Sequence, residues 1–234
     1  FVYEVPAPDV VDAMATLFIA NNWNIEPGVR ALLKSEHFFD SVVRGAKIAS
    51  PIELSIRFLK EVGGYNPTHI LMIQWTSWGL EQVLMNIPSV NGWPRHRNWI
   101  STQSVAERWN ALGWLIWSDD TAPPLDFVGL IEDLVDTTDP HLAFHVGPAL
   151  VEHLLGIPIE ELDIENVSRD FAGDLINNPI PDFIVNGPPH LTNLAKLLLD
   201  WVPWYEWSPY NEQLGYLLRN FVMFITRLPE YNAT

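Results

Sequence analysis

Two histidines spaced four residues apart form the clearest metal-binding pattern in this 234-residue sequence. His141 and His145 share one face of a helix predicted over residues 140–155, and imidazoles on one helix face can bind zinc. A zinc peptidase also needs a glutamate directly after the first histidine, where Leu142 stands. No third ligand is evident, because a proline separates the pair from His153. We therefore expect two ordinary helix residues, with no metal and no cofactor.

The acidic residues and the short motifs do not define a catalytic centre. The acidic segments 133–139 and 163–170 lack the central glycine of a calcium-binding loop. The sequence contains no cysteine, no Gly-x-Ser-x-Gly elbow and no phosphate-binding glycine loop. The two carboxylates of a glycoside hydrolase need not be close in sequence, but no pair is singled out. Enzymatic activity stays open, and we favour a non-enzymatic protein.

The eleven tryptophans are the most prominent candidates for binding. An exposed tryptophan stacks on sugars or anchors a protein partner, because its ring buries a large area at low entropic cost. The candidate contact residues for a ligand or partner are Trp93, Arg95, Arg97, Trp99, Trp201, Trp204 and Trp207. The alternative, which we expect for most of the tryptophans, is core packing between helices.

Residues 86–100 form a loop rich in Pro, Gly and Trp between two helical patterns. Pro88 and Pro94 restrict its backbone, and Gly92 permits a positive φ or a close backbone approach. Trp93 and the second loop tryptophan are expected to cover apolar surface between the flanking helices. We interpret the loop as a structural clasp, and a ligand-binding rim is the alternative.

The same structural motif includes a predicted helix start. Ser50 and Glu53 fit a capping box with Pro51 at the first helical position. Arg108, on the helix that follows the loop, is expected to pair with Glu53 rather than with the adjacent Glu107. This pairing would join two helices across the loop.

Apolar residues recur at helical spacing along almost the whole chain. We predict helices over residues 9–21, 26–35 (continuing over 37–43), 50–63, 66–85, 102–117, 125–136, 140–155, 159–177, 189–201 and 209–227. The Gly-Pro pair at 147–148 is expected to break or kink its helix, and 183–185 could be a short extended piece. The sequence therefore predicts an all-α fold, an irregular bundle of about nine to ten helices.

The formal net charge of the whole chain is −16, and most of this negative charge lies in the second half. Residues 1–118 hold nine Lys/Arg and ten Asp/Glu, whereas residues 119–234 hold four and nineteen. The polar segment 119–124 coincides with this change, so we predict a helical core over 1–118 and an acidic helical region over 119–234, packed as one compact unit. Such acidity argues against nucleic-acid and membrane-surface binding. It either solubilises the surface or docks a basic partner or cations.

No apolar run approaches the roughly 20 residues that a membrane-spanning helix needs. The sequence also opens without a basic region followed by an apolar segment, so we expect no signal peptide in it and a processed or truncated beginning. We therefore do not expect an integral membrane protein.

Several short segments, taken in order, resemble one bacterial family. They are residues 35–38 (Ser-Glu-His-Phe), 47–53 (Lys-Ile-Ala-Ser-Pro-Ile-Glu), Gly79, 88–94 (Pro-Ser-Val-Asn-Gly-Trp-Pro), 99–100 (Trp-Ile) and Arg108. Their order and spacing resemble the C-terminal half of the family catalogued as domain of unknown function 1800, most closely over residues 1–115. Residues 228–231 (Leu-Pro-Glu-Tyr) also resemble the end of that family.

The chain departs from the family pattern at Ala49, Leu80 and Ile87, where the family usually has Lys, Gln and Pro. These departures remove polar groups that could belong to a site. Members of the family are about twice this length, so the resemblance implies that the N-terminal half is missing here. It also implies a mostly helical fold and export from the cytoplasm, and it implies no reaction.

Two hypotheses for function follow. The first is an extracytoplasmic protein, periplasmic or at the cell surface, that binds other proteins as a structural or interaction subunit of an envelope-associated complex. The alternative is a protein that binds carbohydrate or another envelope polymer, or hydrolyses it. Exposed tryptophans beside two carboxylates in a cleft would favour the alternative, which fails if every tryptophan is buried.

Overall fold

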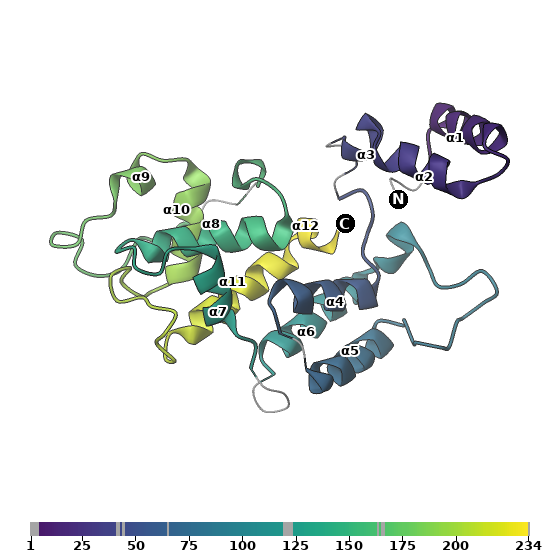
Figure 1. The fold of residues 1–234 in the computed structure, drawn as a ribbon. Helices are drawn as coiled ribbons and strands as arrows, with labels where there is room; N and C mark the ends of the chain where they lie inside the picture. Colours follow the sequence, from purple (N-terminus) through teal and green to yellow (C-terminus); the bar gives the residue numbers. More distant parts are fainter. Residues whose placement is uncertain are drawn as a thin grey trace.

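The chain folds into helices joined by long irregular segments, as a computed structural model shows (Figure 1). The structure describes residues 5–40, 43, 45–64, 66–118, 124–162, 164 and 167–233. Within these residues there is no sheet, and the only strand-like pairing is an isolated antiparallel bridge between Ile48 and Ala233. The prediction of an all-α fold is confirmed.

The described residues contain twelve α-helices, nine of them with seven or more residues. In chain order they are α1 Pro8–Ala20, α2 Ile25–Leu33, α3 Glu36–Phe39, α4 Pro51–Glu61, α5 Pro67–Gly79, α6 Thr102–Ile116, α7 Phe127–Leu134, α8 Leu142–Leu155, α9 Asp182–Val185, α10 Pro189–Leu199, α11 Gly215–Arg227 and α12 Pro229–Asn232. The described residues also include two short 3₁₀ helices, η2 His96–Trp99 and η3 Ile159–Glu161.

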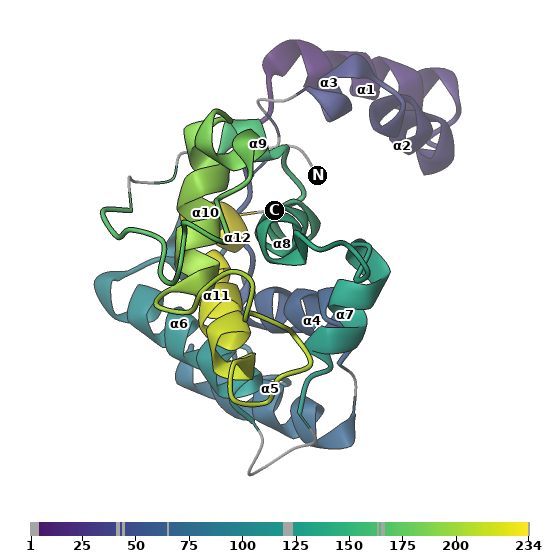
Figure 2. The ribbon, with the colours of Figure 1, turned by 90° about the vertical axis from the view of Figure 1, so that its left-hand side faces the viewer.

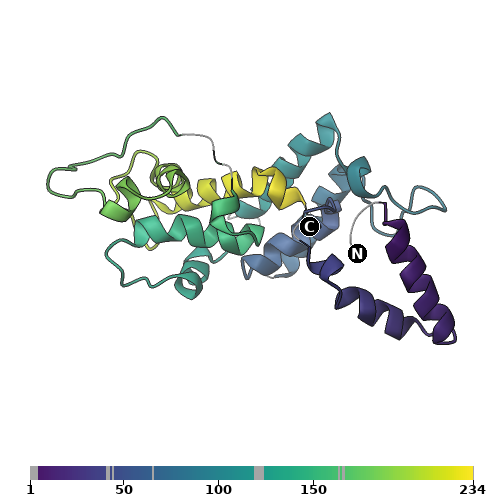
Figure 3. The same cartoon turned by 90° about the horizontal axis from the view of Figure 1, so that it is seen from above.

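Helices α1 to α3 form an N-terminal arm that projects from the rest of the molecule (Figures 1, 2 and 3). Their principal packing is with one another, α1 on α2 and α2 on α3. No residue of α1 is buried, and in α2 only Gly28 is. The arm therefore lacks a hydrophobic core of its own.

Helices α4, α5 and α6 pack together and carry the first part of the core. Helix α4 begins with the Ser50–Glu53 capping box, in which each side chain accepts a hydrogen bond from the backbone N–H of the other residue. Asn66 caps α5 by accepting from the N–H groups of Thr68 and His69. The buried residues that these helices share include Leu54, Phe58, Met72, Leu112 and Leu115.

Helix α8 is the centre of the second half and packs against α10, α11, α7 and α4. Leu150 and Val151 are fully buried there beside Leu194 and Phe221. Helix α11 also packs on α6, so the core crosses the predicted boundary at residues 119–124, of which 119–123 lie outside the described residues. Division of the chain into two regions stays a prediction.

Several predicted helix bounds are wrong. The helix expected over 66–85 ends at Gly79. The helix expected over 159–177 is replaced by the three-residue η3, and the described residues 162, 164 and 167–177 are not helical. The helix expected from 209 begins at Gly215, and residues 183–185 lie in the short helix α9 rather than in an extended piece. Helix α8 continues through Pro148 and is not broken there, held on both sides by core packing.

Candidate functional site

An apolar groove runs between α4 and α5, where two helices leave their outward faces uncovered. Its volume is about 490 Å³, and it is lined by apolar side chains with Lys60 and Gln74: Ile52, Ile56, Leu59, Ile70, Ile73 and Leu84. We call this feature the α4–α5 groove. Three of its lining residues, Ile56, Ile70 and Leu84, are exposed, and a contiguous exposed apolar patch can mark an interaction site.

The outer face of α5 continues this apolar surface. Trp75 and Trp78 are 64% and 67% exposed, and Leu71 beside them is also exposed. Helix α5 contains no Asp, Glu, Lys or Arg over its 13 residues. Its buried side includes the polar residues His69, Thr76 and Ser77, whereas two tryptophans lie on its exposed side. This is the reverse of the usual amphipathic pattern, in which the apolar face points to the core.

The expectation that most tryptophans pack in the core is wrong. Seven of the eleven are exposed: Trp23, Trp75, Trp78, Trp109, Trp114, Trp117 and Trp201. Only Trp99 and Trp207 are buried, and Trp93 and Trp204 are half-buried. Short helices with few layers around them leave too little core volume for eleven indole rings.

The three tryptophans of the C-terminal segment do not form one surface. Trp201 is exposed, whereas Trp204 donates from Nε1 to the carbonyl of Asn178 at 3.2 Å and stacks on His141. Trp207 is buried in the core cluster, and its role as a contact residue stays a prediction. The chain turns into the core between Trp204 and Trp207, so the three tryptophans do not point outward together.

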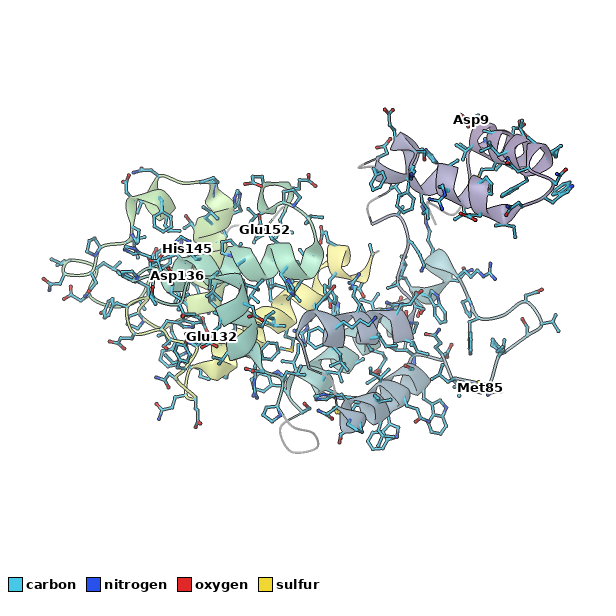
Figure 4. The ribbon with its side chains drawn as sticks, in the orientation of Figure 1. Asp9, Met85, Glu132, Asp136, His145 and Glu152 are labelled. Atoms are coloured by element: carbon cyan, nitrogen blue, oxygen red, sulfur yellow. The ribbon has the colours of Figure 1, made fainter. Side chains whose placement is uncertain are left out.

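Residues 80–100 leave the end of α5 as a long loop (Figure 1). Glu81 and Met85 have positive φ values of 63° and 64°, and Gly92 has 89°. Met85 lies near the outer part of this loop (Figure 4). The loop rejoins the fold where Trp99 is buried and its carbonyl accepts a hydrogen bond from Ser104 Oγ at 2.9 Å.

A second pocket, of about 320 Å³, lies beneath this loop, and we call it the loop pocket. Leu80, Pro88, Pro94 and Trp99 supply apolar walls. The polar lining side chains include Glu81, Asn98, Gln103 and Glu107. Arg95 and Arg97 are exposed and are not among the lining residues, although Arg95 follows Pro94 and Arg97 precedes Asn98 in the sequence. Trp93 is half-buried, and its Nε1 has no hydrogen-bond partner within the described part of the chain.

Arg108 is buried, with only 1% of its surface exposed, and it does not pair with Glu53 as expected. Its Nη2 donates to the carbonyl oxygen of Ala49 at 2.7 Å, and its Nε and Nη1 have no partner among the described residues. Glu53 instead bonds Lys47 and the N–H of Ser50. Burial lowers the pKa of Arg108 to about 10, so the side chain remains a cation at neutral pH.

The C-terminal tail is held on the segment that precedes α4. The N–H of Ala49 donates to the carbonyl of Asn232 at 3.0 Å, beside the bridge between Ile48 and Ala233. Arg57 donates to the carbonyls of Tyr231 and Ala233. Residues 47–53 thus join α4, α6 and the tail, a clasp different from the one predicted at the 86–100 loop.

Three side chains complete this tail clasp: Arg57, Glu61 and Tyr231. The Tyr231 hydroxyl donates to Glu61 Oε2 at 2.8 Å, and Arg57 lies over the Tyr231 ring at 4.3 Å from its centroid. Burial raises the pKa of Glu61, and burial and the neighbouring Glu61 carboxylate raise the pKa of Tyr231. His153 Nε2 lies 2.8 Å from the carbonyl of Glu61 at the rim of a pocket of about 670 Å³. Each acidic group here already has a partner, which is typical of a structural cluster.

His141 and His145 share one carboxylate and two aromatic neighbours. Asp139 lies 3.7 Å from His141 Nδ1 and 3.3 Å from His145 Nε2. His145 stacks on Phe183, with ring centroids 5.4 Å apart (Figure 4 labels His145). Across the residues that the structure describes, no group of three or more His, Asp or Glu side chains could hold a metal ion.

The family model described as "Protein of unknown function (DUF1800)" matches residues 1–197 of this chain. The chain belongs to this family. The match extends well beyond residue 115 and does not include residues 228–231. Correspondence to the C-terminal half of the family stays a prediction. No curated protein and no solved structure matches the chain.

Membership of this family assigns no reaction to the chain. None of the helices in the described ranges is long and apolar enough to cross a membrane. Sequence reasoning missed the α4–α5 groove and the tail clasp. The uncharged run over 67–79 was the available signal for the groove, and the Arg57–Glu61 spacing of four residues was the available signal for the clasp.

Proposed function

We propose that this family member is a protein-interaction subunit of an extracytoplasmic, envelope-associated complex, and that it docks a partner helix on the α4–α5 groove and the outer face of α5. The uncovered apolar face of α5 carries this proposal. The extracytoplasmic location is supported only by the family resemblance, since exported proteins predominate among the proteins that the motifs resemble.

The size of the apolar surface favours a protein partner. A tryptophan buries about 150–250 Å² when covered, so covering the exposed two-thirds of Trp75 or Trp78 is worth roughly 3 kcal/mol each at about 25 cal/mol per Å². Two such rings beside a groove of about 490 Å³ resemble the aromatic anchors that dominate protein interfaces. Helix-in-groove docking uses apolar side chains spaced one turn apart, which this groove between two helices fits.

Charge defines the expected partner further. Residues 45–118 carry six Lys/Arg and four Asp/Glu, a net charge of +2 within a chain of −16. Lys60 lines the groove itself. The favoured partner is therefore an amphipathic helix with acidic residues beside its apolar face, because opposite charges across an interface steer association.

The test is to purify tagged chain from native envelope extracts and measure the mass of the complexes that it forms. We expect a co-purifying protein whose recovery is lost in the Trp75→Glu/Trp78→Glu double variant. Trp201→Glu is the matched control, because Trp201 is equally exposed, at 63%, but lies in the acidic half. A chain that is monomeric in native extracts, with no co-purifying protein, contradicts the proposal.

A further inference from the structure

A cleft of about 670 Å³ lies between the end of α6, the start of α7 and the start of α11, and we call it the α6–α11 cleft. Its volume falls within the range of about 300–1,000 Å³ typical of small-molecule sites. Its lining combines aromatic rings with charged side chains, and it shares no residue with the α4–α5 groove. We propose that this cleft binds a neutral saccharide, an activity separate from the protein docking described above.

Two aromatic rings of the lining are open to solvent. Trp117, directly after α6, is 42% exposed, and Tyr210 is 55% exposed. Tyr216 adds a half-buried ring from the first turn of α11. Aromatic rings offer flat apolar surfaces to the C–H groups of a sugar, and they lose little side-chain entropy when their positions are already fixed.

Contacts within the chain hold both exposed rings in place. Arg219 of α11 lies over the Trp117 ring, 5.3 Å from its centroid, and so joins the end of α6 to the start of α11. The Tyr210 hydroxyl donates to Glu132 Oε1 of α7 at 2.9 Å (Figure 4 labels Glu132). Leu218, which also lines the cleft, is buried and supplies fixed apolar surface. The stacking surfaces are therefore positioned before a ligand binds.

The polar side chains of the lining suit hydroxyl groups. Asp126 and Glu212 accept hydrogen bonds, whereas the Arg219 guanidinium donates them. A sugar hydroxyl donates and accepts at the same time, so it can use both kinds of group. An exposed tryptophan, Trp117, thus lies in one cleft with two carboxylates, which is the combination expected for a carbohydrate ligand.

The charges of the lining nearly balance. Arg219 and Glu212 are both lining residues and carry one charge of each sign. The second carboxylate, Asp126, caps α7 by accepting from the N–H of Gly129 at 2.8 Å, where the helix dipole places partial positive charge. A site for a simple cation or anion would carry a clear excess of the opposite charge. The balance here favours a ligand without net charge.

The experiment is isothermal titration of the full chain with neutral tetrasaccharides of glucose, mannose, galactose and N-acetylglucosamine. We expect at least one of them to bind at concentrations on the order of millimolar or below. Trp117→Ala and Tyr210→Ala should each weaken that binding roughly ten-fold, because each removes a ring that the sugar covers. Glu212→Ala should weaken it roughly five-fold by removing a hydrogen-bond acceptor.

Matched control variants lie outside the cleft. Trp114→Ala removes an exposed ring from the last turn of α6, and Glu206→Ala removes an exposed carboxylate from the same half of the chain as Glu212. Neither residue belongs to the lining, so neither substitution should change the affinity by more than about two-fold.

The proposal is overturned if none of the four tetrasaccharides binds, or if the Trp117 and Tyr210 variants bind as tightly as the native chain. It is also overturned if only charged tetramers bind, those of glucosamine or galacturonic acid, since that result would assign a charged ligand. Tyr210 is exposed, so Tyr210→Ala keeps the test decisive even where loss of the Arg219 contact makes Trp117→Ala less stable. Circular dichroism of each variant checks that the fold is intact.

Discussion

Removing the Tyr231 hydroxyl tests whether the tail clasp stabilises the fold. Tyr231 has none of its surface exposed, and its hydroxyl donates to Glu61 Oε2 at 2.8 Å. The raised pKa of Tyr231 keeps the hydroxyl protonated and therefore a donor at all ordinary pH values. Tyr231→Phe deletes this bond and leaves the ring under Arg57 in place.

The expected cost follows from burial and charge. A hydrogen bond to a charged group contributes about 1.5–3 kcal/mol to the free energy of unfolding. Removing the donor also leaves the Glu61 carboxylate partly buried without this bond, which is unfavourable because the group has lost contact with water. For a chain of this length, 1 kcal/mol shifts the melting temperature by about 2–4 °C. Tyr231→Phe should therefore lower the melting temperature by roughly 3–12 °C, measured by circular dichroism or calorimetry.

The chain contains its own matched control. Tyr210 donates from its hydroxyl to Glu132 Oε1 at 2.9 Å, the same chemistry at almost the same distance, but Tyr210 is 55% exposed. Water replaces the lost partner at such a site, so Tyr210→Phe should change the free energy of unfolding by no more than about 0.5 kcal/mol. Equal shifts for the two variants would refute the argument that burial makes the clasp strong.

Three further predictions concern the same region and the helix ends. The raised pKa of Glu61 means that the folded state binds a proton more tightly than the unfolded state, so the contribution of Glu61 to stability falls as pH rises above about 4.5. Glu61→Gln should therefore gain stability relative to the native chain as pH increases over that window. Parallel curves of unfolding free energy against pH for the two proteins would contradict this. Ser50→Ala removes the acceptor for the Glu53 N–H and should cost about 1 kcal/mol in chemical denaturation, with Ser89→Ala, in the exposed loop, as the neutral control. Gly156 ends α8 with a φ of 65°, and a Cβ added there would contact no other atom, so Gly156→Ala should cost about 1 kcal/mol of unfolding free energy through backbone strain alone. Gly79→Ala is the control, because Gly79 lies within α5 and the substitution causes no such strain.

Some helix starts and ends could be predicted from the sequence, because residues at the helix end determine the local backbone conformation. Ser50, Pro51 and Glu53 define the start of α4, and Gly156 ends α8 in the left-handed conformation. These signals act within one helical turn, so a single sequence contains all the information needed.

The failed helix over 159–177 shows where local patterns stop being sufficient. Its backbone is satisfied from a distance: Asn193 Oδ1 accepts from the N–H of Val167, and Lys196 donates to the Val167 carbonyl. The Tyr205 hydroxyl likewise accepts from the N–H of Asp174 at 3.0 Å. Side chains about 30 residues away replace the helical hydrogen bonds, and spacing along the segment does not reveal them.

The candidate sites depended even more on distant contacts. Arg57 reaches the carbonyls of Tyr231 and Ala233, more than 170 residues away in sequence. The interpretation of the tryptophans failed for a related reason, because burial of Trp75 or Trp78 requires a neighbouring element, and none of the described residues supplies one. The same absence is what makes the face of α5 a candidate interface.

Footprinting of tryptophan side chains in native envelope extracts shows whether a partner covers the outer face of α5. Oxidative labelling of Trp75, Trp78 and Trp201 would be compared between the extract and the purified chain, in which all three are exposed. We expect Trp75 and Trp78 to be protected in the extract, while Trp201 is labelled equally in both samples. Equal labelling of Trp75 and Trp78 in the two samples would contradict it.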